Sequence, residues 1–112
     1  EDLAAAFLER KGYQILQRNY RFKKSEIDLI CSCNQLLVFV EVKTRSSNAF
    51  GSGKAAVSRS KFTKILKAIE YYFLEKMQLN EIPDFQIDVV SIRKSGESFF
   101  CEHIQNIGDD DF

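Results

Sequence analysis

The chain has 112 residues, a formal net charge of zero and 45% hydrophobic residues, which suffices for one domain with a real core. One proline and five glycines exclude a low-complexity or collagen-like chain. No apolar run approaches the roughly 18 residues that a membrane span needs. Three cysteines without a framework spacing favour a reducing compartment. We therefore expect a single cytoplasmic domain over residues 1–112 that does not contact a membrane.

Basic and acidic residues are unevenly distributed along the chain. Residues 1–67 hold 13 Lys or Arg and 6 Asp or Glu, whereas residues 68–112 hold 3 and 10. A neutral protein with two opposite poles can present a basic face to nucleic acid. Ordinary scatter of surface charge explains the same counts equally well, because halves of a sequence need not be faces of a fold.

The pattern of apolar residues predicts helix, three strands, helix and two strands, in that order. We expect these elements at residues 1–11, 13–22, 26–32, 36–45, 59–78, 85–93 and 97–104. Residues 46–58 form a loop rich in glycine and serine. The buried stripe of the long helix is predicted at Phe62, Ile65, Leu66, Ile69, Phe73 and Met77. A long helix between strands indicates a crossover and an α/β fold with a mixed central sheet of about five strands flanked by helices.

The third strand carries charges where an apolar strand should continue. Residues 36–40 read Leu-Leu-Val-Phe-Val, apolar on both faces, as expected for a covered central strand. Glu41 and Lys43 follow, and strand alternation places both side chains on one face. Charges at the inner end of such a strand are costly unless they are paired or bind an ion.

A tight hairpin would bring a second carboxylate to Glu41. In an antiparallel pair, directly opposite residues share a face. A two-residue turn at Asn34-Gln35 sets Asp28 opposite Glu41, and a turn at Cys33-Asn34 sets Asp28 diagonal to Glu41 on the same face. A register shifted by one residue from either of these separates the two carboxylates. In the second strand, we expect Ile27 and Leu29 to share the face opposite to Asp28.

Two adjacent carboxylates raise each other's pKa unless a cation lies between them. Mg²⁺ prefers oxygen ligands and usually takes one or two carboxylates, with water and phosphate completing the shell. Asp28 and Glu41 fit that pattern, with the carbonyl of Val42 as a third oxygen, and Lys43 would orient water or stabilise charge on the phosphorane. The alternative is a plain salt-bridge ladder of Asp28, Glu41 and Lys43 at a strand end.

Several other residues have a functional and a structural interpretation. Basic residues interleaved with Tyr20 and Phe22 would grip a nucleic-acid backbone and stack a base, although such aromatics usually belong to a core. Glu26 is either a supporting carboxylate or a solvated one. Cysteine spacing on strands is poor for zinc, and His103 alone is expected to be structural. The candidate nucleic-acid-binding residues, each also a plausible solvated cation, are Arg18, Arg21, Lys23, Lys24, Arg45 and Lys61.

Asp28 followed by Glu41-Val42-Lys43 resembles the PD-(D/E)xK nuclease core. More closely, the chain resembles the YraN-type family, small uncharacterised bacterial proteins similar to archaeal Holliday-junction resolvases. Two positions depart from that pattern, with Ser25 in place of a glycine and Gln86 in place of an arginine. The matching segments are Glu1 with Ala4-Ala5, residues 12–16, 18–21, 26–30 and 38–45, Phe50-Gly51, Lys61, residues 87–90 and residues 103–106.

The resemblance implies a restriction-endonuclease-like fold and a nuclease-type site. Asp28 and Glu41 would be metal ligands, Lys43 the catalytic lysine, and Glu1 a helix carboxylate that reaches the metal or its water. Resolvases that cut paired strands act as dimers, so the resemblance also allows a homodimer.

Three hypotheses follow. The first is a Mg²⁺- or Mn²⁺-dependent endonuclease acting on DNA, including branched or structured DNA. The second is a non-catalytic module with a nuclease-like fold that binds nucleic acid or protein, which the neutral charge favours. The third assigns the acidic second half to a protein partner or a dimer interface.

Overall fold

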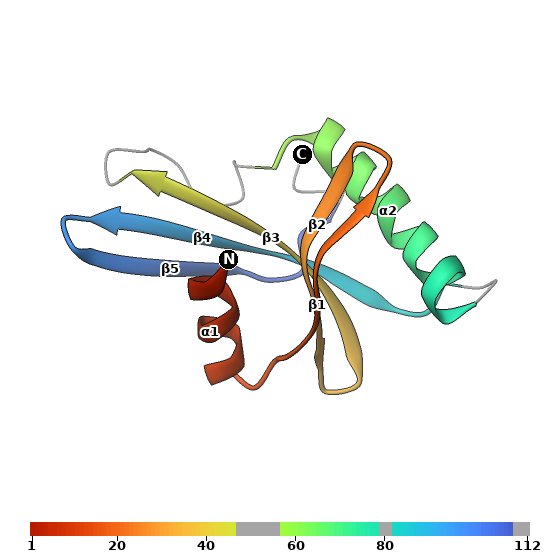
Figure 1. Ribbon diagram of the computed structural model, residues 1–112, viewed down its shortest axis with the longest axis horizontal. Helices are drawn as coiled ribbons and strands as arrows, with labels where there is room; N and C mark the ends of the chain where they lie inside the picture. Colours follow the sequence, from red (N-terminus) through yellow and green to blue (C-terminus); the bar gives the residue numbers. More distant parts are fainter. Residues whose placement is uncertain (47–56, 79–81, 109–112) are drawn as a thin grey trace.

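The computed structural model describes residues 1–46, 57–78 and 82–108 (Figure 1). The predicted order of seven elements is confirmed. Helix α1 spans Asp2–Arg10 and helix α2 spans Arg59–Met77. The strands are β1 (Gln14–Phe22), β2 (Ser25–Cys33), β3 (Leu36–Ser46), β4 (Phe85–Ser95) and β5 (Ser98–Ile104). Most of the expected loop at 46–58 and the end of the chain lie outside the described residues. In the described part of the chain, no helix is long and apolar enough to cross a membrane.

The five strands form one mixed sheet in the order β1-β2-β3-β4-β5. All neighbours are antiparallel except β3 and β4, which run parallel. The crossover from β3 to β4 contains α2, as the position of a long helix between strands predicted. The expected α/β fold, a five-stranded mixed sheet flanked by two helices, is therefore confirmed.

The helices cover opposite faces of the sheet, and each face has its own core (Figure 1). Phe39 of β3 packs with Ile69 and Phe73 of α2, whereas Val38 and Val40 pack with Leu8 of α1. These three residues of β3 are at most 1% exposed. Because β3 is covered on both sides, its first half can be apolar throughout, and the charged residues at its end are forced to find partners.

Helix α2 begins at a side-chain cap and buries a stripe close to the predicted one. The hydroxyl of Ser58 accepts a hydrogen bond from the amide of Lys61 at 3.1 Å. The prediction that Met77 is buried is wrong, because its residue surface is 43% exposed. Burial ends one turn earlier, at Tyr72 and Phe73, and the helix itself ends at Gln78 in the left-handed conformation.

The hairpin between β2 and β3 has the register of the first predicted turn. Asn34 and Gln35 both have positive φ, 52° and 68°, as a two-residue hairpin turn requires. Cys33 pairs with Leu36, and the pairing continues to Leu29 opposite Val40. The next positions along this register are Asp28 on β2 and Glu41 on β3.

The buried carboxylate of Asp88 on β4 connects the segment after α1 to β5 and to the chain that follows it. This residue is fully buried and accepts from Gln86 (3.0 Å), the amide of Asn106 (2.9 Å), His103 (2.7 Å) and Tyr13 (3.4 Å). The ammonium of Lys11, directly after α1, lies 2.6 Å from the other ring nitrogen of His103. An ammonium can only donate, so Nδ1 accepts and Nε2 donates to Asp88. His103 is therefore structural, as predicted, and the Gln86 amide makes a contact where the resemblance expects an arginine.

Candidate active site

Strands β2 and β3 separate at Asp28. Their pairing ends at Leu29 opposite Val40, and the amide of Val42 then donates to Oδ2 of Asp28 at 2.8 Å. Beyond this point the two strands diverge (Figure 1). A side chain thus takes the place of the next backbone partner. We call the space between residues 25–28 of β2 and residues 41–43 of β3 the fork.

The regular alternation of β2 breaks at the fork. The prediction that Ile27 and Leu29 share a face is wrong, because Ile27 joins the core under α2 and Leu29 joins the core under α1. Two irregularities of β1 accompany this change. The β1–β2 register shifts between Ile15 and Gln17, and Asn19 has a φ of 54°. Asn tolerates the left-handed conformation better than most residues, and bulged strands twist more strongly. Beyond the fork, the β1–β2 hairpin extends away from β3 (Figure 1).

The fork opens into a cavity of about 540 Å³. The cavity lies between the start of β2, the end of β3 and the first turns of α2. The cavity therefore lies between the two charged segments predicted from the sequence, Asp28 on β2 and Glu41 with Lys43 on β3. Its lining residues are Lys24, Ser25, Glu26, Asp28, Glu41, Val42, Lys43, Ser58, Ser60, Lys61, Lys64 and Ile65.

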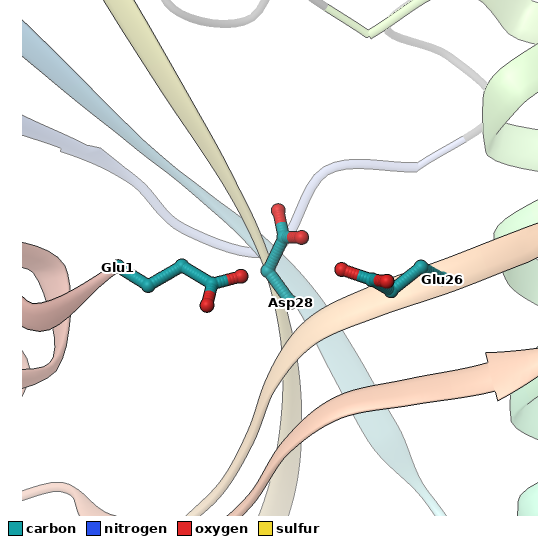
Figure 2. A group of neighbouring side chains, drawn as sticks. All are labelled: Glu1, Glu26 and Asp28. Carbon is teal, nitrogen blue, oxygen red and sulfur yellow. The ribbon is translucent and has the colours of Figure 1, made fainter.

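Three carboxylates converge on one side of the fork. Glu1, Glu26 and Asp28 each offer an oxygen, and these atoms all lie within 4.8 Å of one another. Figure 2 shows Glu1 reaching in from the start of α1 while the other two side chains come from β2. Glu1 was expected here from the family resemblance alone, whereas Glu26 was considered only as a supporting carboxylate. We call these three residues the carboxylate cluster.

Asn19 holds two members of the cluster. Its side-chain amide lies 2.6 Å from Oε1 of Glu1 and 2.9 Å from Oε1 of Glu26. Glu26 also forms an ion pair with Arg21 at 3.2 Å. Sequence reasoning missed Asn19. The available signal was an asparagine inside a predicted strand, a residue that is depleted in strands and tolerates positive φ.

The pKa of Asp28 is raised to about 6. Burial is the largest cause, the negative charges of Glu41, Glu1 and Glu26 act in the same direction, and the hydrogen bond from Val42 opposes them. An ionised Asp28 at neutral pH therefore lacks enough compensating positive charge from the protein itself.

Glu41 faces lysines rather than the carboxylate cluster. It is 4% exposed, and its Oε1 contacts both Nζ of Lys43, at 3.4 Å, and Nζ of Lys61. The hydrogen bond and the charge of Lys61, together with burial, lower the pKa of Lys43, although Glu41 opposes them. Burial opposes a rise in the pKa of Lys61, but its contact with Glu41 prevails and raises it. That Asp28 and Glu41 together bind a metal stays a prediction.

The other expected basic residues are dispersed around the hairpin. Arg18 pairs with Asp2 at 2.5 Å, and Arg21 pairs with Glu26. Lys24 and Lys61 line the cavity, and Lys23 lies over the ring of Phe22. Arg45 is half-buried near the end of β3. Tyr20 is 4% exposed and belongs to the core, so only Phe22 of the two β1 aromatics is available for stacking.

Fold and site together define an α/β domain whose forked sheet carries a carboxylate cluster and, on β3, a buried glutamate that is paired with two lysines. The profile of the family described as "Uncharacterised protein family UPF0102" matches residues 1–92. The chain belongs to this family, which is the YraN-type family that the motifs resemble.

Relatives from several bacteria align over nearly the whole chain. A UPF0102 protein of Flavobacterium johnsoniae is 42% identical over 105 residues, covering 93% of this chain and 85% of the relative. One of Carboxydothermus hydrogenoformans is 37% identical over 109 residues, covering 97% and 91%. The solved structure of Pyrococcus furiosus SfsA in complex with Ca²⁺ has a TM-score of 0.39 and 13% identity, covering 95% of this chain and 59% of that chain. A similarity this remote carries no functional conclusion.

Proposed function

We propose that the protein is a metal-dependent nuclease that hydrolyses phosphodiester bonds of DNA at the fork. The observation that carries the proposal is the convergence of the carboxylate cluster, two of whose members, Glu26 and Asp28, line one open cavity together with Lys43 and Lys61. Acids and bases facing each other in a cleft are the groups that phosphodiester hydrolysis needs, namely cation ligands and proton-handling or charge-stabilising residues.

The donor set fits a hard divalent cation. The candidate ligands are carboxylate oxygens and the backbone carbonyl of Val42, and such oxygen donors suit Mg²⁺ and Mn²⁺. Asp28, Glu1 and Glu26 would hold the ion, and the remaining oxygen of Glu41 is the candidate side-chain ligand on β3. A bound ion would lower the pKa of a water molecule and polarise the phosphate. Its charge would also compensate the carboxylates whose repulsion raises the pKa of Asp28.

The two lysines have different roles in this proposal. Lys61 and burial lower the pKa of Lys43, and its Nζ would orient the attacking water or stabilise charge on the phosphorane. Lys61 has a raised pKa and keeps its positive charge near the phosphate oxygens. Glu41 positions both ammonium groups through a single oxygen.

The test is cleavage of four-way junction, forked, single-stranded and duplex DNA with Mg²⁺ or Mn²⁺. Wild type is expected to cut at least one of these substrates, and chelation should abolish cutting. Asp28→Asn and Lys43→Ala should each lower the rate by about 100-fold or more, as removal of one transition-state interaction does. Asp84→Asn is the matched control, since Asp84 is an exposed carboxylate before β4.

A second candidate is a non-catalytic nucleic-acid-binding module on the same fold. The ion pairs of Glu41 with both lysines favour it, because a lysine pair occupied by a carboxylate can be purely structural. Salt-sensitive DNA binding without cutting under any metal condition would contradict the nuclease proposal and support this module.

A further inference from the structure

A shallow groove lies next to the fork, between the β1–β2 turn and α2. It has a volume of about 380 Å³ and is lined by Phe22, Lys23, Lys24, Ser25, Lys64 and Lys67. Lys24, Ser25 and Lys64 also line the fork cavity, so the two hollows share a wall. Figure 1 shows the β1–β2 hairpin extending alongside α2. We call this hollow the aromatic groove.

Two rings in contact lie at the edge of the groove, with Phe22 lining the groove itself and Tyr71 lining a neighbouring hollow. Phe22 at the end of β1 and Tyr71 of α2 have centroids 4.6 Å apart and planes inclined at 36°. Tyr71 is 37% exposed, and its hydroxyl bonds to Glu75 one turn later on the same helix. A second hollow of about 350 Å³ continues past these rings to Leu74, which is 56% exposed. The ring pair therefore forms a half-exposed apolar surface. The contact between the rings and the hydrogen bond of Tyr71 to Glu75 fix its position.

Lysines surround the ring pair. The ammonium of Lys23 lies 5.4 Å from the centroid of Phe22, and Lys24, Lys64 and Lys67 line the groove. Glu70, at the far end, is the one acidic residue among the described residues that line either hollow. An apolar ring surface with a cationic border matches a nucleotide, whose flat base stacks on rings while its phosphate meets ammonium groups.

We propose that the aromatic groove binds an unpaired nucleotide of a DNA strand and leads that strand into the fork. The base stacks on the ring pair of Phe22 and Tyr71, and the backbone follows Lys67 and Lys64 toward the carboxylate cluster. Bases inside a duplex are already stacked on each other and cannot reach the ring pair. This inference rests on the proposed function and assigns its substrate class, DNA with a single-stranded segment.

Binding is measured by fluorescence anisotropy in EDTA, with labelled oligothymidine and a blunt duplex of equal length. Wild type is expected to prefer the single strand. Tyr71→Ala should weaken single-strand binding about tenfold, the usual effect of losing one base–aromatic stack. Tyr71→Phe keeps the ring and should retain the affinity. Equal binding of Tyr71→Ala and wild type would overturn the inference.

Phe99→Ala is the matched control for the ring. Phe99 lies on β5, is 46% exposed and has the ammonium of Lys94 5.8 Å from its centroid. It therefore offers a similar exposed ring with a lysine on a different part of the sheet. This variant should bind like wild type, and a loss equal to that of Tyr71→Ala would show unspecific binding and contradict the proposal.

A charge variant and a second readout keep the test independent of folding effects. Lys67→Gln should weaken single-strand binding, whereas Lys76→Gln, which removes a lysine paired with Glu75 on the same helix, should not. The chain has no tryptophan, so bound oligothymidine should quench tyrosine fluorescence in wild type and much less in Tyr71→Phe. A preference for single strands without any cutting would contradict the nuclease proposal but not the groove. Cutting that Tyr71→Ala leaves unchanged would contradict the groove but not the nuclease proposal.

Discussion

Asp28 has two functions at the residue scale. One oxygen accepts from the amide of Val42 and so replaces a missing backbone partner where β2 and β3 separate. The same carboxylate belongs to the carboxylate cluster, and burial together with the charges of Glu41, Glu1 and Glu26 raises its pKa. An apolar residue would serve neither purpose. A carboxylate that stabilises the fork by hydrogen bonding but destabilises it by repulsion is suited to bind a cation.

This conflict predicts that Asp28→Asn stabilises the metal-free protein. The asparagine keeps an acceptor for Val42 but has no charge. Because the pKa of Asp28 rises from 3.8 unfolded to about 6 folded, its contribution to stability is full below pH 4 and is lost as the pH rises through 6. At pH 8 in EDTA, the variant should be more stable by about 1 kcal/mol, allowing for partial solvent screening.

Urea unfolding between pH 4 and pH 8 measures this effect. The advantage of Asp28→Asn should shrink toward zero as the pH falls. Asp28→Ala is the control, because it removes both the charge and the acceptor for Val42. A constant difference between wild type and Asp28→Asn across the pH range would show that the charge of Asp28 is not the cause.

The buried Glu41 predicts a different outcome. Glu41→Gln leaves two neighbouring ammonium groups without their carboxylate. Removing one partner of a fully buried ion pair costs about 3–5 kcal/mol, and since the side chains of Lys43 and Lys61 are 32% and 36% exposed we expect roughly 2 kcal/mol. The double variant Glu41→Gln/Lys61→Gln should recover part of this loss in urea unfolding. Additive losses would mean that the ion pair is not what stabilises this part of the fold.

At the scale of elements, the β2–β3 hairpin was predictable and the β1–β2 hairpin was not. The two-residue turn at Asn34-Gln35 and the apolar run before Glu41 fix the first register, since one residue of slip would expose the core face. The irregular β1–β2 register and the left-handed conformation of Asn19 accompany packing of neighbouring β2 residues against two different helices, which local alternation does not predict. Alternation along β2 therefore failed between Ile27 and Leu29.

Asn19 allows its backbone and side-chain roles to be separated. Asn19→Gly keeps the freedom to adopt a φ of 54° and loses the amide that contacts Glu1 and Glu26. Asn19→Ala loses both, and an alanine in the left-handed conformation costs about 1 kcal/mol more. Calorimetry with Mn²⁺ should show weaker binding in both variants, and only Asn19→Ala should unfold at markedly lower urea. Unchanged Mn²⁺ affinity in both would mean that Asn19 does not organise the cluster.

The site itself was predictable in part. Asp28, Glu41 and Lys43 were placed by strand alternation and turn length, and all three line the cavity. Lys61 was expected near the substrate, but its contact with Glu41 depends on where α2 begins, which Ser58 sets by capping. The contacts of Asn19 with Glu1 and Glu26 depend on how β1, β2 and the start of α1 pack together, and the only local signal for them was an asparagine inside a predicted strand.

At the scale of the whole molecule, the basic first half of the chain does not act as one basic face. Arg18 and Arg21 pair with Asp2 and Glu26, whereas Lys24 and Lys64 line both the fork cavity and the aromatic groove. A neutral protein can therefore still bind a polyanion along one path. The number of basic residues follows from the sequence, but which of them form ion pairs is known only from the fold.

This distribution predicts which cations determine the salt dependence of DNA binding. Removing one lysine that binds a phosphate should reduce the slope of log K against log salt by about 0.7 for single strands. Lys64→Gln should show this reduction, whereas Arg21→Gln should leave the slope nearly unchanged because Arg21 is paired with Glu26. Anisotropy titrations at several salt concentrations provide the slopes. A larger change for Arg21→Gln than for Lys64→Gln would place the DNA on β1 instead.

The carboxylate cluster is proposed to hold a divalent cation, and the nuclease function depends on that ion. Isothermal titration of Mn²⁺ into the wild-type protein at pH 7.5 tests it directly, with Asp28→Asn and Asp84→Asn titrated in parallel. We predict one Mn²⁺ bound per chain in wild type and in Asp84→Asn, and none in Asp28→Asn. No binding to the wild type, or equal binding to all three proteins, would contradict this prediction.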